Sequence, residues 1–226
     1  MKKLILFACA LCMSVCAIAQ TTFYVYKTDG SSVEYAISDV DSISFTAPAD
    51  PANGHEYVDL GLPSGLKWAT CNVGAATPEA YGEYYAWGET APKSSYSSDN
   101  YSYSDNPDVL PLDKDAARAN WGGQWRMPTD AEWTELREKC TWTWTTLNGK
   151  NGYEVKGANG NSIFLPAAGY RGSGGLSGAG GYGRYWSSSL DTDGPSGAWG
   201  VGFDSGFVGR SHSSRFFGRS VRPVLK

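Results

Sequence analysis

The chain has 226 residues, a formal net charge of −4 and 41% hydrophobic residues, which is enough to build a buried core. No polybasic run is present, and this excludes the usual electrostatics of a nucleic-acid-binding protein. Aromatic residues make up 14% of the chain beside 28 glycines, a composition that favours short strands joined by tight turns. We therefore expect an α+β protein with few helices and no nucleic-acid partner.

Residues 1–19 have the pattern of a signal peptide. Lys2 and Lys3 precede an apolar stretch over 4–18, and Ala17-Ile18-Ala19 is a small-x-small cleavage site. The apolar stretch is too short to cross a bilayer comfortably. We predict cleavage after Ala19, no membrane span, and export to the periplasm, the cell surface or the outside.

Residues 20–47 are predicted to form a small β-meander with strands at 23–26, 33–37 and 43–45. Asp29-Gly30 is a typical hairpin turn between the first two strands. Residues 48–54 are rich in Pro, Ala and Asp and are predicted to be a linker. Residues 55–226 then form the main domain.

The clearest element of the main domain is a helix that begins after Thr129. Glu132 follows three residues later, which is the spacing of a capping box. Trp133, Leu136 and Cys140 then recur at helical spacing and predict one buried stripe. A short helix is expected over 113–120.

Strands are expected at both ends of the main domain, over 57–60 and 221–224. Near the C-terminus, Trp199, Val201 and Phe203 alternate with small residues and are predicted to face the core. Asp204-Ser205-Gly206 then turns the chain in a hairpin.

Trp125-Arg126-Met127-Pro128-Thr129-Asp130-Ala131-Glu132-Trp133 resembles the Arg-x-Pro-Thr-x-x-Glu-Trp signature of the C-type-lectin-like and formylglycine-generating-enzyme superfamily. The chain is most similar to the Fibrobacter succinogenes major paralogous domain, which is abundant in secreted Bacteroidetes proteins. The resemblance extends over most of 55–226. It also rests on Tyr57-Val58-Asp59-Leu60-Gly61-Leu62-Pro63-Ser64-Gly65-Leu66-Lys67-Trp68-Ala69, Tyr85-Ala86-Trp87-Gly88-Glu89, Phe164-Leu165-Pro166-Ala167-Ala168-Gly169-Tyr170-Arg171, Tyr185-Trp186-Ser187-Ser188-Ser189 and Ser220-Val221-Arg222-Pro223-Val224.

The resemblance implies a lectin-like fold in which the first and last strands lie side by side. It gives the signature a structural role, because one fold hosts many activities. We expect Trp125 and Trp133 in the core, Arg126 in a buried polar contact, and Pro128, Thr129 and Glu132 at the helix start. Trp121 and Trp125 could instead stack on sugars.

Only Cys71 and Cys140 lie beyond the predicted leader. Two cysteines in an oxidising compartment most often pair, so a disulfide between them is predicted.

Residues for catalysis are missing. The resemblance implies a copper-holding cysteine pair near the C-terminus in the oxygenases and a histidine and carboxylate iron site in the sulfur-transferring enzymes. Here the C-terminal region has no cysteine, and His55 and His212 are the only histidines. Asp191-Thr192-Asp193-Gly194 resembles part of a calcium loop but lacks the further ligands. We predict no enzyme activity, no metal and no cofactor, with calcium the one ion left open.

Two surface loops are the candidate ligand-binding residues. Residues 93–104 have the Tyr, Ser, Asn and Asp content of antibody-like binding surfaces, with Tyr96, Tyr101 and Tyr103 as contacts. A mobile polar insertion would have the same composition. The second loop, 209–219, offers Arg210, His212 and Arg215 and, by resemblance, lies on the ligand-facing side. Its Phe216 and Phe217 are expected to pack back on the core.

Three functions follow from these observations. The first is a non-catalytic exported module that binds a glycan or a protein. The second is a receptor diversified by a retroelement, since lectin-like domains are common targets of such elements. The third is a metal-dependent oxygenase-like enzyme, which the missing ligands disfavour.

Overall fold

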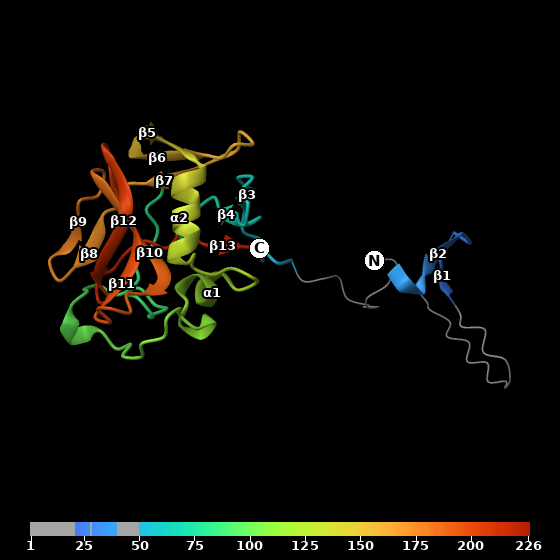
Figure 1. The fold of residues 1–226 in the computed structure, drawn as a ribbon, viewed down its shortest axis with the longest axis horizontal. Helices are drawn as coiled ribbons and strands as arrows, with labels where there is room; N and C mark the ends of the chain where they lie inside the picture. Colours follow the sequence, from blue (N-terminus) through green and yellow to red (C-terminus); the bar gives the residue numbers. More distant parts are fainter. Residues whose placement is uncertain (1–20, 28, 40–49) are drawn as a thin grey trace. The chain divides into compact units, whose positions relative to one another are not determined.

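The computed structural model describes residues 21–27, 29–39 and 50–226, and the chain divides into two compact units, Met1–Pro48 and Ala49–Lys226 (Figure 1). In the first unit, β1 (Thr22–Tyr26) and β2 (Ser32–Ala36) form an antiparallel hairpin, followed by a 3-10 turn at Ile37–Asp39. The predicted leader and the predicted third strand lie outside the described residues. No helix in the described parts is long and apolar enough to cross a membrane.

The second unit is built from small antiparallel sheets and belongs to the α+β class with few helices and many short strands. Two α-helices, α1 (Ala116–Trp121) and α2 (Asp130–Lys139), and 3-10 turns at Ser98–Asn100 and Leu112–Lys114 accompany the sheets. The strands are β3 (Tyr57–Asp59), β4 (Lys67–Ala69), β5 (Thr141–Leu147), β6 (Lys150–Lys156), β7 (Ser162–Pro166), β8 (Tyr170–Gly172), β9 (Gly175–Ser177), β10 (Tyr182–Leu190), β11 (Gly197–Asp204), β12 (Phe207–Ser214) and β13 (Val224–Leu225). Their sheet orders are β13-β4-β3, β5-β6-β7, β8-β9 and β10-β11-β12.

The predicted capping box is present at the start of α2. Thr129 Oγ1 accepts the Glu132 N–H at 3.2 Å, and the Glu132 carboxylate accepts the Thr129 N–H at 2.8 Å. Arg126 donates to both Glu132 oxygens, at 2.8 and 2.6 Å, so it makes the expected polar contact. The shorter helix α1 begins at Ala116, three residues later than the sequence pattern predicts, because the buried Asp115 carboxylate accepts the Ala117 and Arg118 N–H groups.

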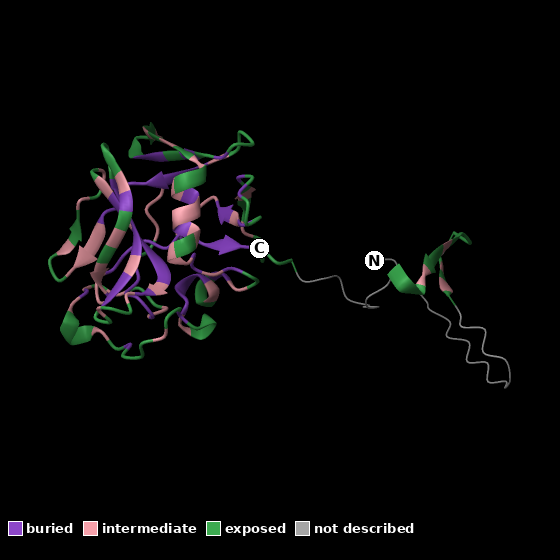
Figure 2. Cartoon of the chain, in the orientation of Figure 1, coloured by how far each residue is buried: buried purple, intermediate pink, exposed green. Residues whose placement is uncertain are grey.

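Most residues of β10 and β11 are buried (Figure 2). The sheet β10-β11-β12 contributes to two core clusters, one on each face. Trp125 belongs to the cluster on one face, with Trp186 and Ala198. Trp133 belongs to the other cluster, with Val201 and Phe203. Both signature tryptophans are therefore buried, as predicted, but in different clusters. Trp121 is buried as well and stacks on His55, with ring centres 3.9 Å apart.

Trp199 departs from the predicted core-facing set. It is only half-buried, and the Arg210 guanidinium lies 3.3 Å from the centre of its ring. Val201 and Phe203 are fully buried, as predicted.

The first and last strands do not pair with each other, which corrects the arrangement that the resemblance implies. β4 lies between β3 and β13 and pairs with both. The fully buried Arg222 fastens the last segment. It donates to Asn72 Oδ1 and to the carbonyl oxygens of Ala69, Thr70 and Phe164.

Residues 50–54, which composition predicts as linker, pack on the second unit instead. Ala52 is buried, and its carbonyl oxygen accepts the Trp125 indole N–H at 2.7 Å. The Asn53 amide donates to the Trp121 carbonyl oxygen at 2.6 Å. Small side chains let the backbone approach these tryptophans, a contact that composition does not reveal.

The predicted disulfide is a further correction, because Cys71 and Cys140 are both free. Cys71 packs against the cluster that holds Trp125, and Cys140 packs against the cluster that holds Trp133. Cys140 ends α2 as its C-cap and is half-buried, and burial raises the pKa of its thiol. Each cysteine thus fills space in a separate core cluster.

Candidate functional site

A cleft of about 400 Å³ lies between the loop at 98–104 and the ends of β11 and β12. It brings together the two loops that the sequence singles out as ligand-binding. We call it the serine cleft, because five of its lining residues are serines. Its lining residues are Ser98, Tyr101, Ser102, Tyr103, Ser104, Ser196, Ser214, Arg215 and Phe216.

Arg215 holds the two sides of the cleft together. Its Nε donates to the Tyr101 hydroxyl at 2.7 Å. Its Nη2 donates to the Tyr103 and Asp105 carbonyl oxygens, at 2.6 and 2.9 Å. Its Nη1 donates to Asn106 Oδ1 and the Pro195 carbonyl oxygen, at 2.7 and 2.9 Å. All five N–H directions of the planar fork are thereby used within the protein.

Aromatic rings surround the same guanidinium. The Trp87, Tyr101 and Tyr103 ring centres lie 4.9, 5.4 and 5.4 Å from its central carbon. Arg215 is only 4% exposed, although the sequence analysis places it among the exposed contacts. It organises the loop and has no donor left for a ligand.

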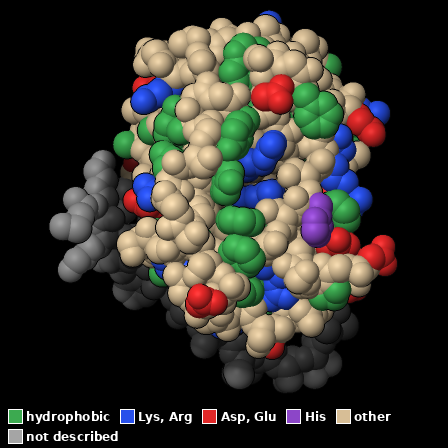
Figure 3. Space-filling model, turned by 90° about the vertical axis from the view of Figure 1, so that its left-hand side faces the viewer, with side chains coloured by type: hydrophobic (Ala, Val, Ile, Leu, Met, Phe, Trp, Pro, Cys, Tyr) green, Lys and Arg blue, Asp and Glu red, His purple; other side chains and the backbone are tan. Residues whose placement is uncertain are grey.

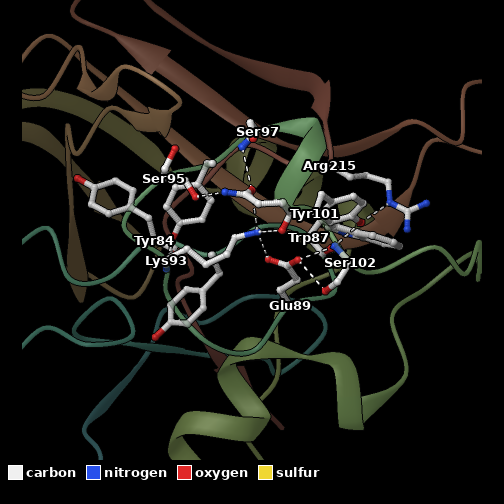
Figure 4. A network of polar contacts seen from close by, with 12 residues as sticks. Tyr84, Trp87, Glu89, Lys93, Ser95, Ser97, Tyr101, Ser102 and Arg215 are labelled. Atoms are coloured by element: carbon white, nitrogen blue, oxygen red, sulfur yellow. Dashed lines mark hydrogen bonds and ion pairs between the residues drawn. The ribbon is translucent and has the colours of Figure 1, made fainter.

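A second network fixes the other side of the loop (Figure 4). The Glu89 carboxylate accepts the Ser102 N–H and hydroxyl, at 2.9 and 3.0 Å, and pairs with Lys93 Nζ at 2.6 Å. Lys93 Nζ also donates to the Asn100 carbonyl oxygen, and the Asn100 amide donates to the Ser95 carbonyl oxygen. The stretch 95–102 is therefore tied down through its own backbone, unlike a mobile insertion.

Tyr96 is the residue of this loop that differs most from its predicted role. It is fully buried, its hydroxyl donates to the Tyr84 carbonyl oxygen, and it accepts the Lys93 N–H at 2.8 Å. Tyr103 is buried as well, with its ring against Gly88, where a Cβ would lie 2.0 Å from a ring carbon. Both tyrosines are buried beneath the loop and hold it to the core, whereas the sequence predicted them as exposed ligand contacts.

Tyr101 is half-buried and lines the cleft. Its hydroxyl donates to the Trp87 carbonyl oxygen at 2.8 Å. Burial raises the pKa of Tyr101 to about 12, so its hydroxyl stays neutral and keeps this role at physiological pH.

Arg210 and His212 lie apart from the cleft lining. Arg210 covers Trp199 and pairs with Asp130, with Nη2 2.9 Å from Oδ2, at the start of α2. His212 Nε2 lies 3.1 Å from Asp191 Oδ2. Asp191, the first residue of the calcium-like stretch, thus faces a histidine, and no group of three His, Cys, Asp or Glu residues gathers for a metal in the part of the chain that the structure describes.

Several residues that shape the site were not predicted from the sequence. Asn106 and Pro195 receive the Arg215 fork, and Ser196 and Ser214 line the cleft. Glu89 and Lys93 lie four residues apart, but they lie outside any helix, where this spacing does not indicate an ion pair. Arg215 lies 109 residues from Asn106 and 20 residues from Pro195, so neither contact follows from a local pattern.

Comparisons with protein-family models, curated proteins and solved structures find no match to this chain.

Proposed function

We propose that this chain is an exported, non-catalytic module of the lectin-like class that binds a glycan in the serine cleft. The signature residues at 125–133 support the class through their resemblance. The leader-like residues 1–19 support export. The composition of the cleft supports the ligand, and it is the observation on which the proposal rests.

The cleft joins hydroxyl groups with aromatic surface. Ser98, Ser102, Ser104 and Ser196 are exposed, and the half-buried rings of Tyr101 and Phe216 lie beside them. Serine hydroxyls both donate and accept hydrogen bonds, as sugar hydroxyls do. Aromatic faces stack on the C–H faces of sugar rings. A neutral, hydroxyl-rich ligand therefore suits this lining better than a strongly charged one.

The ordered loop favours binding for a second reason. A flexible loop loses conformational freedom when it closes on a ligand, and this loss weakens the affinity. Here Arg215 and Glu89 already hold Tyr101, Ser102 and Tyr103 in place. The loop meets a ligand with its backbone preorganised.

A glycan array with the chain from Gln20 onward tests the proposal. Ser104→Trp fills the cleft, and Ser205→Trp places the same ring on the exposed β11–β12 turn as a matched control. We expect at least one glycan whose binding falls tenfold or more in Ser104→Trp and is unchanged in Ser205→Trp. A silent array, or a protein ligand captured through the cleft in place of any glycan, would refute the proposed function.

A further inference from the structure

Arg184 and Arg219 are neighbouring cations without an acidic partner. No carboxylate within the described residues forms an ion pair with either side chain. Arg219 is 5% exposed. Burial, with the nearby Arg184 charge, lowers the pKa of Arg219 to about 9, so Arg219 is still charged at neutral pH. This local positive charge stands out in a chain whose net charge is −4.

The two guanidinium groups lie on one face of the β10-β11-β12 sheet. Arg184 on β10 pairs with Gly202 on β11, and a Cβ at Gly202 would lie 2.3 Å from Arg184 Nη1. Because Gly202 has no side chain, the Arg184 guanidinium can lie directly against the sheet. Arg219 reaches in from the segment beside β10, and its guanidinium carbon lies 4.4 Å from the centre of the Trp186 ring.

Ser211 on β12 joins the pair. Its hydroxyl accepts from Arg219 Nη1 at 3.3 Å, and its Cβ is 3.2 Å from the position that a Gly202 side chain would occupy. Figure 3 shows the side of the second unit that carries β8, β9 and β12, where basic side chains gather near the centre beside a column of hydrophobic side chains. We call Arg184, Trp186, Gly202, Ser211 and Arg219 the arginine shelf.

The shelf leaves hydrogen-bond donors unused. Arg219 Nε is buried and has no partner among the described residues. Its Nη2 makes no hydrogen bond there either, so the Ser211 contact is the one hydrogen bond that this side chain forms. A buried charged donor without an acceptor is costly, and an oxyanion would satisfy two such donors at once.

We propose that the arginine shelf binds an oxyanion, carboxylate or sulfate, carried by a sugar of an acidic glycan. Such a group would accept from Arg219 and Arg184 together, as a bidentate acceptor fits guanidinium forks. The shelf shares no residue with the lining of the serine cleft, so this proposal does not depend on the cleft.

The aromatic surroundings favour a sugar over an acidic peptide. The Arg184 guanidinium lies 5.0 Å from the centre of the Tyr182 ring. Tyr182 stacks on Tyr170, with ring centres 6.2 Å and planes 25° apart, and both rings are half-buried. Stacked rings next to paired cations can hold the C–H face of a sugar whose carboxylate or sulfate reaches the arginines.

Binding of five probes tests the shelf. They are trigalacturonic acid for a carboxylate sugar, a chondroitin sulfate tetrasaccharide for a sulfated one, neutral maltotriose, sodium sulfate and a pentaglutamate peptide. The variants are Arg219→Met and Arg184→Gln, and Lys139→Gln removes one exposed charge as the control.

In Ser104→Trp, where the serine cleft is filled, at least one acidic oligosaccharide should bind at least tenfold more tightly than maltotriose. Binding of trigalacturonic acid identifies a carboxylate, and binding of the chondroitin sulfate tetrasaccharide alone identifies the sulfate, because that tetrasaccharide carries carboxylates as well. The affinity for the acidic oligosaccharide should fall tenfold or more in Arg219→Met and Arg184→Gln but not in Lys139→Gln. Without ligand, Arg219→Met should melt at or above the wild-type temperature, because an unpaired buried charge is removed. A merely structural Arg219 would instead lower the melting temperature when replaced.

Unchanged affinity in both arginine variants would overturn the proposal. Equally tight binding of maltotriose and the acidic sugars to Ser104→Trp, in which the serine cleft is filled, would do the same, as would binding of the peptide or free sulfate alone. If Arg219→Met does not fold, the affinity of Arg184→Gln for the acidic sugar tests the proposal instead. Ser104→Trp should keep its affinity for the acidic sugar, so a failure of the cleft and a failure of the shelf are separable.

Discussion

Arg215 and Arg219 lie four residues apart and are almost equally buried, with 4% and 5% of their surface exposed. Their surroundings differ sharply. Arg215 forms five hydrogen bonds and ties the serine cleft together. Within the described residues Arg219 forms one, to Ser211, and its buried Nε has no partner there.

The difference separates two uses of a buried cation. A guanidinium whose donors all meet protein acceptors stabilises the fold and has nothing left for a ligand. A guanidinium that is buried but unsatisfied contributes little to stability, and its open donors suit a ligand that brings acceptors. Burial alone does not tell these roles apart.

Arg215→Met should have the largest effect on stability. It strands the Tyr103, Asp105 and Pro195 carbonyl oxygens, and losses from several unmet buried groups add to about 3 kcal/mol or more. Urea unfolding should show this loss, with hydrogen exchange rising first at 101–106. Arg215→Lys should rescue little, because one ammonium cannot reproduce the planar fork. If Arg215→Met is as stable as wild type, Arg215 stabilises the fold no more than Arg219 does, and the proposed difference between them is wrong.

Glu132→Gln tests how much Arg126 contributes to stability, because this arginine, unlike Arg219, has a carboxylate partner. Burial acts to raise the pKa of Glu132, but hydrogen bonds from Arg126 and the Thr129 N–H outweigh it, and the pKa lies below its usual range. The ionised group therefore stabilises the fold above the unfolded pKa of about 4.3, and this stabilisation is lost as the pH falls through the folded pKa.

We expect Glu132→Gln to cost about 1–2 kcal/mol at pH 7 and less in acid. Unfolding at pH 7 and at pH 3 would measure the difference, with Glu138→Gln on the exposed side of α2 as the control. A loss equal at both pH values would mean that the charge of Glu132 does not matter.

Gly202→Ala should have the smallest effect on stability and a specific effect on the shelf. The new Cβ meets the far end of the flexible Arg184 side chain, which can swing away, so the change should stay within about 1 kcal/mol. Affinity for the acidic sugar should nevertheless fall, because Arg184 leaves its place. Gly174→Ala, where no atom lies within 4 Å of the added Cβ, is the matched control. If Gly202→Ala and Gly174→Ala bind the acidic sugar equally well, Arg184 does not contribute to binding at the shelf.

Local features of the fold were predictable from the sequence. Thr129 and Glu132 predict the start of α2, since a capping box depends on residues three apart. Val201 and Phe203 are buried as their alternation predicts, and Asp204-Ser205-Gly206 turns the hairpin between β11 and β12. The resemblance-based fold itself stays a prediction beyond its α+β class.

The candidate sites were less predictable. The predicted contacts divide, because Tyr101, Tyr103 and Arg215 line the cleft, Tyr96 lies buried, and Arg210 and His212 stand elsewhere on β12. Composition singled out the loop that lines the serine cleft but did not indicate which of its tyrosines face inward. The rings of Tyr96 and Tyr103 turn inward because Tyr84 and Gly88 offer a carbonyl oxygen and an open space.

The sequence by itself determined the features that depend on neighbours along the chain: the capped helix, the hairpin turns and the content of short strands. Only the tertiary structure decided which arginine is satisfied, that the cysteines stay apart, and that β4 separates the terminal strands. The physical reason is the range of the interactions. Four of the five acceptors that satisfy Arg215 come from a segment about a hundred residues away, and the missing acceptor of Arg219 among the described residues becomes visible only after all segments are in place.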